Sequence, residues 1–181
     1  MLHRLFALLA VALVALLPAL MFGSAGGETL TAVGSDPAEA AVARAEPDQL
    51  RCPLAERLRP AFESAASETG LPIALLVALA DTESGMREDA VSEAGAVGVL
   101  QVLPATAAEL GLDARHSPSN ILAGARYLRK QLERFRSMDL ALAAYHAGPA
   151  AVLRAGGAPT GATLGYIGRV TTSWLALADC R

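Results

Sequence analysis

Apolar residues recur with helical spacing along the chain after about residue 50, and the runs are interrupted at glycines and prolines. Gly70, Gly111 and Gly156 each follow such a run, whereas Pro60 and Pro104 stand where a run begins. Proline fits the first turn of a helix, and glycine commonly ends one because it adopts the left-handed conformation without steric cost. Strand signals are nearly absent. The pattern therefore predicts an all-α or mainly helical α+β fold, in a single compact domain.

We expect helices at residues 60–69, 73–80, 104–110, 121–135, 140–147, 149–155 and 163–178. The second of these is apolar on all sides, so it should be the buried central helix of the domain. Ser119 or Asn120 could cap the helix that begins at residue 121, and Asp139 could cap the next one.

A loop is expected between the second and third helices, because residues 86–101 show no helical period and include Gly95 and Gly98. These glycines permit loop conformations and a close backbone approach that a side chain would block. A β-strand at residues 96–103 is the alternative for this stretch.

The start of the chain has the order of a secretory signal peptide. A basic start at residues 1–4 is followed by an apolar run at 5–22 and by small residues, so residues 1–25 are assigned to the signal. An uncleaved membrane anchor is the alternative. Residues 26–50 are rich in Ala, Gly and acids and read as a flexible linker, which leaves 51–181 as the domain. We expect the domain to be exported, with membrane contact only through the first segment.

Charge and cysteine content narrow the possible functions. From about Leu50 onward the chain carries as many acidic as basic residues, which argues against nucleic-acid binding. Cys52 and Cys180 stand at the two ends of the domain, and in an oxidising compartment we expect them to form a disulfide; two free thiols are the alternative. The scattered histidines lack metal-ligand spacing, and there is no glycine-rich phosphate loop, so neither metal nor cofactor is expected.

Glu83 is the first candidate for chemistry, because it follows the most apolar stretch of the chain directly. Loss of solvation favours the protonated form of a carboxyl group and raises its pKa. A carboxylic acid that stays protonated near neutral pH can donate a proton to a glycosidic oxygen. From this stretch alone, a surface glutamate at a helix end is the favoured interpretation, and Asp81 is a competing acid nearby.

Four blocks of sequence extend this picture. They are ESGMREDAVSEAGAVGVLQVLPATA at 83–107, NILAGARYL at 120–128, ALAAYHAGP at 141–149 and TLGYIGRV at 163–170. In content and order they resemble the soluble lytic transglycosylase family (transglycosylase SLT domain) of the lysozyme-like superfamily. The resemblance covers about residues 60–174.

The resemblance implies a lysozyme-like, mainly helical fold with a groove for the glycan strands of peptidoglycan. Such enzymes are carbon–oxygen lyases that cut the MurNAc–GlcNAc β-1,4 bond and leave 1,6-anhydromuramyl ends. The family's catalytic acid and base falls on Glu83. The substrate-binding positions that the resemblance implies are Ser92, Gln101, Tyr145, His146 and Tyr166. No second carboxylate is marked, and a sugar that supplies its own 6-hydroxyl as nucleophile does not need one.

The chain departs from the family pattern at several places. His146 stands where the family has Asn, which suggests a changed pH profile, since histidine titrates near neutral pH. Leu100 and Leu103 replace residues that are often Met, and Ala162 replaces a common Glu. Two other functions stay open: a hydrolytic muramidase resembling goose-type lysozyme, and a non-catalytic wall-binding component of an envelope-spanning machine. Small relatives of this kind often serve a secretion or conjugation apparatus, which is the partner the resemblance implies besides peptidoglycan.

Overall fold

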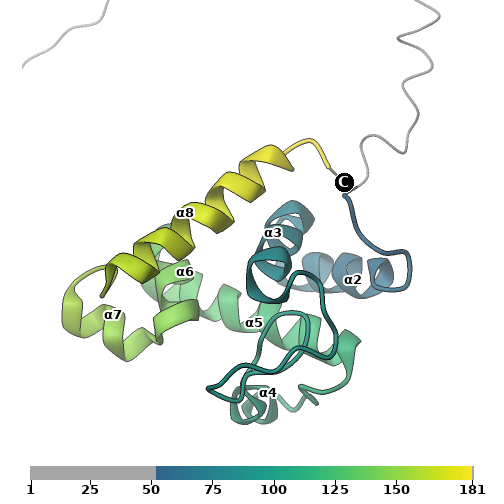
Figure 1. Ribbon diagram of the computed structural model, residues 1–181, viewed down its shortest axis with the longest axis horizontal. Helices are drawn as coiled ribbons and strands as arrows, with labels where there is room; N and C mark the ends of the chain where they lie inside the picture. The colour runs from purple at the N-terminus through teal and green to yellow at the C-terminus, as the bar shows by residue number, and fades with distance from the viewer. Residues whose placement is uncertain (1–51, 181) are drawn as a thin grey trace, which may run out of the picture. The chain divides into compact units, whose positions relative to one another are not determined.

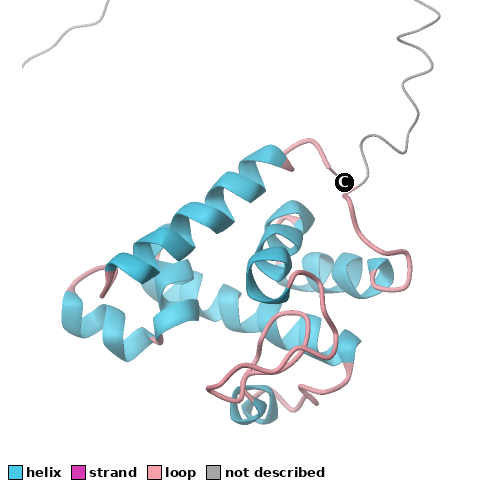
Figure 2. Cartoon of the chain, in the orientation of Figure 1, coloured by secondary structure: helices cyan, strands magenta, loops and turns pink. Residues whose placement is uncertain are grey.

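The computed structural model describes residues 52–180. The predicted signal peptide at 1–25 and linker at 26–50 lie outside the described residues and stay predictions. The helices of the described part are α2 (Arg59–Thr69), α3 (Ile73–Ser84), α4 (Pro104–Glu109), α5 (Ser117–Phe135), α6 (Met138–Ala147), α7 (Pro149–Ala155) and α8 (Gly161–Ala176). Figures 1 and 2 show how they gather around α3 and α5.

The mainly helical fold class is confirmed, since the described residues include no strand (Figure 2). The alternative of a β-strand at 96–103 is wrong. Only isolated antiparallel bridges form there, between Val97 and Val102 and between Val91 and Val97. The glycines on either side of Val97 turn the backbone too sharply for a longer ladder, because Gly95 and Gly98 both have φ near +75° to +79°.

Helix α3 is the buried central helix, as its uniform apolar pattern predicts. All residues from 74 to 80 are buried, and Leu75, Leu76 and Leu79 have no exposed surface. The helix packs mainly against α8 and also against α2. Each fully buried leucine contributes about 1.5–3 kcal/mol relative to an exposed one. This burial fixes the position of the polar residues at the end of α3.

The end of α3 lies farther along the chain than expected. The helix continues past Ala80 to Ser84 and ends at Gly85, whose φ is +61° and whose N–H bonds to the carbonyls of Ala80 and Asp81. The apolar stretch ends before the helix does, and the glycine supplies the stop. Glu83 therefore lies in the last helical turn rather than in the loop after it.

Two predicted caps are wrong. Helix α5 begins at Ser117, and Asn120 is a fully buried residue of its first turn whose side chain bonds to the loop before α4. Helix α6 is capped by Ser137, whose hydroxyl accepts from the N–H of Leu140, and not by Asp139. Asn120 bonds to another loop instead of capping its helix, and Ser137 takes the capping role expected of Asp139. Local sequence preference does not reveal either outcome.

The predicted disulfide is confirmed. Cys52 and Cys180 are joined across 128 positions of sequence, which ties the start of the described chain to its end. In the chain-entropy description, closing a loop of this length stabilises a domain by about 5 kcal/mol. None of the helices within residues 52–180 has the length and apolar character needed to cross a membrane.

Candidate active site

The centre of the site is a hydrogen bond between α3 and α8. The hydroxyl of Tyr166 donates to Oε1 of Glu83 at 2.6 Å. Tyr166 is buried on the face of α8 that packs against α3, and Glu83 lies in the last turn of α3. The packing of these two helices thus joins residues that are 83 positions apart in sequence.

The environment of Glu83 favours its protonated form. Burial raises the pKa of its carboxyl from 4.5 to about 7, and the hydrogen bond from Tyr166 opposes this rise. Burial and the adjacent Glu83 raise the pKa of the Tyr166 hydroxyl well above its usual value, so it remains a donor. Near neutral pH, Glu83 can therefore both give and accept a proton.

The end of α3 is fixed to the loop of residues 86–103, called here the 86–103 loop. The hydroxyl of Ser84 donates to the carbonyl of Val99 at 2.8 Å and accepts from the N–H of Arg87 at 3.0 Å. Ser84 directly follows Glu83, so these bonds couple the position of the acid to the position of the loop.

Gln101 lies in this loop with an unusual backbone. Its φ is +45°, which is uncommon for a residue with a side chain and is held only where the surroundings enforce it. The side-chain nitrogen donates to the carbonyls of Gly98 at 2.9 Å and Ala90 at 3.2 Å. With its nitrogen engaged in the loop, the side-chain oxygen is the atom that can accept a hydrogen bond from a ligand.

Ser92 lies farther out in the same loop. It is exposed, and its hydroxyl accepts from the N–H of Ala96 at 3.0 Å. Within the described residues no hydrogen bond joins Ser92 to Glu83. Ser92 thus belongs to the outer part of the loop, whereas Tyr166 contacts both Glu83 and His146.

Aromatic rings surround Glu83 on its α6 side. The ring of His146 stacks on that of Tyr166, with centroids 4.4 Å apart and an angle of 16° between the planes. Burial and the nearby Arg169 lower the pKa of His146. Tyr145 donates from its hydroxyl to the carbonyl of Leu100 at 2.7 Å, and its ring lies 5.4 Å from that of Tyr127.

A pocket of about 270 Å³ opens beside these rings. It is lined by Gln101, Val102, Leu103, Thr106, Tyr127, Tyr145, His146, Ala147 and Gly148. Three of the predicted substrate-binding residues share it, and its walls mix polar and apolar groups as a sugar site requires. Tyr127 and Thr106 were not predicted as site residues. Tyr127 belongs to the family block at 120–128, and this could have pointed to it as a site residue. The helical pattern of that block is equally consistent with a place in the helix core.

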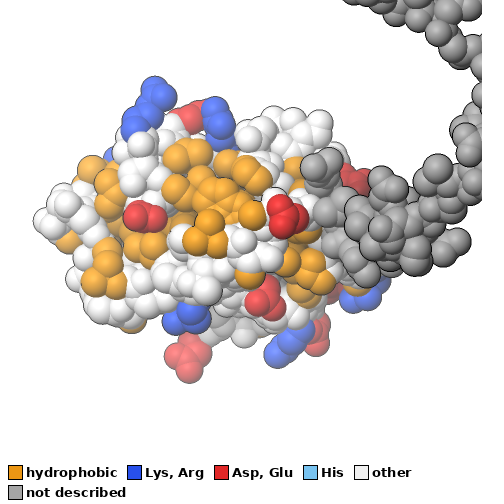
Figure 3. Space-filling view, turned by 90° about the horizontal axis from the view of Figure 1, so that it is seen from above, with side chains coloured by type: hydrophobic (Ala, Val, Ile, Leu, Met, Phe, Trp, Pro, Cys, Tyr) orange, Lys and Arg blue, Asp and Glu red, His pale blue; other side chains and the backbone are white. Residues whose placement is uncertain are grey.

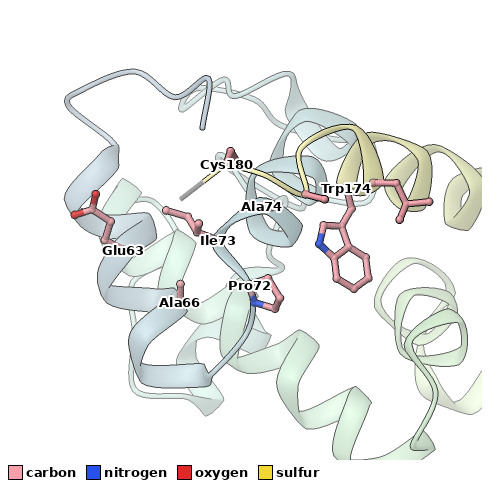
Figure 4. A pocket seen from close by; sticks show the side chains of 9 residues that line it. Glu63, Ala66, Pro72, Ile73, Ala74, Trp174 and Cys180 are labelled. Atoms are coloured by element: carbon pink, nitrogen blue, oxygen red, sulfur yellow. The ribbon is translucent and has the colours of Figure 1, made fainter. Parts of the chain in front are cut away.

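A larger cavity of about 680 Å³ lies at the other end of α3 (Figure 4). It is lined by Glu63, Ala66, Pro72, Ile73, Ala74, Trp174, Leu175, Ala178 and Cys180. Seen from above α8, apolar side chains gather on this side of the molecule (Figure 3). The walls are almost wholly apolar and include none of the predicted catalytic or substrate-binding residues, so this cavity offers little to sugar hydroxyls. Within residues 52–180 no group of His, Cys, Asp and Glu is arranged to hold a metal ion.

Comparison with known proteins assigns the family. Residues 60–162 match the family model described as "Transglycosylase SLT domain". The chain belongs to this family. The predicted resemblance is thereby confirmed, and the SLT domain accounts for most of the described helices.

Relatives of this SLT domain include named transglycosylases. A transglycosylase of Enterobacteria phage PRD1 is 37% identical over 86 residues, which are 47% of this chain and 32% of that protein. Membrane-bound lytic murein transglycosylase F 1 of Alkalilimnicola ehrlichii is 39% identical over 100 residues, which are 51% of this chain and 20% of that protein. The chain thus spans less than a third of the length of these relatives.

Solved structures share the fold of this SLT domain. An inactive mutant of the lytic transglycosylase Slt from Pseudomonas aeruginosa has a TM-score of 0.63 and 26% identity, covering 70% of this chain and 24% of that one. The 70 kDa soluble lytic transglycosylase of Escherichia coli has a TM-score of 0.60 and 26% identity, covering 69% and 24%. These matches confirm the lysozyme-like, all-helical fold.

Proposed function

We propose that this protein is a peptidoglycan lytic transglycosylase that cleaves the MurNAc–GlcNAc β-1,4 bond and leaves 1,6-anhydromuramyl ends. The observation that carries the proposal is the contact of Tyr166 with Glu83, on a carboxyl whose pKa burial raises to about 7. Membership in the SLT family and similarity to proteins named lytic murein transglycosylases support the substrate class. The solved Slt of Pseudomonas aeruginosa is an inactive mutant with a glutamate replaced by glutamine, which supports a glutamate as the catalyst.

Glu83 acts first as the acid. The Tyr166 hydroxyl donates to Oε1, so the transferable proton is carried by Oε2. This proton passes to the glycosidic oxygen, which leaves as the 4-hydroxyl of GlcNAc while the bond to C1 of MurNAc breaks. A protonated carboxyl is needed for this step, and the desolvated environment of Glu83 maintains it near neutral pH.

Glu83 then acts as the base. Its carboxylate takes the proton of the MurNAc 6-hydroxyl, and that oxygen bonds to C1, which closes the 1,6-anhydro ring and restores the protonated acid. Glycosidases that use water or a protein nucleophile place a second carboxylate at the bond. The family blocks mark no second carboxylate beside Glu83, which favours attack by the substrate's own hydroxyl. An intramolecular attack also has a large entropic advantage.

The glycan strand is proposed to run past Gln101, Tyr145 and His146, which line one pocket, and His146 connects this pocket to Glu83 by stacking on Tyr166. Ser92 would contact the strand farther along the 86–103 loop. Aromatic rings and amide groups suit a sugar, whose faces are apolar and whose edges carry hydroxyls. The protein would act outside the cytoplasm, where peptidoglycan lies and where the Cys52–Cys180 disulfide persists. Local wall opening for a secretion or conjugation apparatus is the setting that fits such an activity.

The test is a product analysis. Purified peptidoglycan is incubated with the protein and with Glu83→Gln, and the released muropeptides are identified by mass spectrometry. We expect anhydromuramyl ends from the wild type and none from the variant. Reducing ends would identify a hydrolytic muramidase on the same fold, and wall binding without release by either protein would identify a non-catalytic wall-binding component.

A further inference from the structure

The buried side chain of Asn120 makes three hydrogen bonds to backbone groups. It is fully buried in the first turn of α5. Its Nδ2 donates to the carbonyls of Val97 at 2.8 Å and Ala114 at 2.9 Å, and its Oδ1 accepts from the N–H of Leu100 at 2.8 Å. Two carbonyls on one side and an N–H on the other allow only one orientation of the amide. The side chain therefore holds the 86–103 loop at two points, before and after Gly98.

The backbone of the loop is built to admit this side chain. A Cβ placed on Gly98 would lie 2.7 Å from Nδ2 and 2.8 Å from Cγ of Asn120, closer than real Cβ atoms come. Gly98 also has φ of +75°. The same loop has a second glycine with nearly the same conformation, Gly95 with φ of +79°, but nothing lies within 4 Å of a Cβ added there. Of these two glycines, Gly98 is the one at which contact with Asn120 leaves no room for a side chain.

The fixed segment leads directly to the proposed substrate-binding residues. The peptide groups of Leu100 are held on both sides, because Asn120 accepts from its N–H and Tyr145 donates to its carbonyl at 2.7 Å. Gln101 comes next and keeps the left-handed backbone described above. Ser84, beside the acid, bonds to Val99 in the same segment. The segment 97–101 is thus fastened to α3, α5 and α6 at successive residues.

We propose that Asn120 is a positioning residue, which sets the 86–103 loop so that Gln101 meets the glycan strand in register with Glu83. It touches neither the acid nor Tyr166, and the loop reaches Glu83 only through the bond of the neighbouring Ser84 to Val99, so we expect its loss to weaken binding of the strand more than it slows the chemical step. This inference rests on the proposed function of the site.

The first test is Asn120→Asp. The variant keeps an acceptor for the N–H of Leu100 but loses both donors and turns an oxygen toward two carbonyls. With soluble glycan strands at pH 8, we expect KM to rise about tenfold while kcat stays near that of the wild type. As pH falls, a protonated carboxyl can donate to one of the carbonyls, so the ratio of the variant KM to the wild-type KM should decrease. An unchanged KM at pH 8, or a ratio that does not vary with pH, would overturn the proposal.

The second test approaches the contact from the loop. Gly98→Ala adds a methyl group against Asn120, whereas Gly95→Ala adds the same group, with similar backbone strain, into open space. We expect a clearly larger rise of KM for Gly98→Ala than for Gly95→Ala. Equal effects would show that backbone strain alone is responsible and would reject the role of Asn120. Phe62→Leu, a core change in α2, serves as the control for lost stability and should leave KM unaltered below its melting temperature.

A binding measurement separates this inference from the proposed function. The Kd of glycan strands is measured with Glu83→Gln alone and with Asn120→Asp added to it. A wild type that releases no muropeptide would reject the proposed function, yet a weaker Kd in the double variant would still support positioning by Asn120. Cleavage by the wild type with equal Kd values for the two variants would reject the positioning role alone.

Discussion

The imidazole ring of His146 stacks on the phenol ring of Tyr166, with centroids 4.4 Å apart, while the hydroxyl of Tyr166 donates to Glu83. Three residues from three helices thus form one continuous contact, in which the tyrosine separates the imidazole from the carboxyl. Because the tyrosine is buried and keeps its proton, we expect a positive charge on His146 to strengthen the hydrogen bond from the Tyr166 hydroxyl to Glu83.

Replacing His146 with Asn should change the pH dependence of cleavage. Burial and Arg169 keep the pKa of His146 below its usual 6.5, so the ring is neutral at pH 7 and gains a proton only in acid. A protonated ring on Tyr166 would strengthen the tyrosine as a donor and lower the pKa of Glu83, which makes Glu83 a weaker base toward the 6-hydroxyl and so lowers the rate. Rates of muropeptide release between pH 4 and 8 should show this acid-side loss in the wild type and less of it in the variant. If the pH–rate curves of the wild type and His146→Asn coincide, the prediction is wrong.

Replacing Tyr166 with Phe should move the alkaline limb of the same curve. The hydrogen bond from Tyr166 lowers the pKa of Glu83 against the larger effect of burial. Without it, the pKa should rise further, so the protonated acid should persist to a pH higher by on the order of one unit. The measurement is the pH at which the rate falls to half its maximum. A limb that stays in place, or that moves to lower pH, would contradict this assignment of the donor.

Glu83 should also make the stability of the domain depend on pH. Its pKa is raised from 4.5 to about 7 in the folded state, so the folded chain binds more protons than the unfolded chain between these values. The contribution of this group to stability therefore falls as pH rises through this window. Glu83→Gln should be more stable than the wild type at pH 8 by roughly 3 kcal/mol and about equal to it at pH 4.

Denaturant unfolding at the two pH values measures this difference. Glu63→Gln, which changes an exposed acid on α2, is the matched control and should show no such pattern. A Glu83→Gln variant that is destabilised at both pH values would contradict the raised pKa of Glu83 in the folded protein.

The disulfide should contribute a large part of the stability. Removing both Cys52 and Cys180 by substitution with Ser should lower the free energy of unfolding by about 2–5 kcal/mol, because the unfolded chain is no longer closed over 128 positions. The melting temperature with and without a reductant measures the effect. The wild type should lose stability when reduced and the double variant should not respond. A wild type that is equally stable when reduced would contradict the prediction.

The sequence by itself determined the helical class, the central helix and the family. Each of these follows from local order along the chain: uniform apolar character marks α3 as buried, glycines and prolines mark the ends of helices, and the four blocks mark the SLT domain. The pairing of Cys52 with Cys180 was also predictable, since two cysteines leave a single intramolecular choice.

Only the tertiary structure decided the contacts between distant residues. The sequence placed Glu83 next to an apolar run, but the size of its pKa shift and its partner Tyr166 depend on how α8 covers the end of α3. The sequence predicted Asn120 as a possible helix cap, because local preference cannot show that backbone groups of Val97, Leu100 and Ala114 bind its side chain instead. Hydrogen bonds and desolvation act through space, so they are fixed by packing and not by position along the chain.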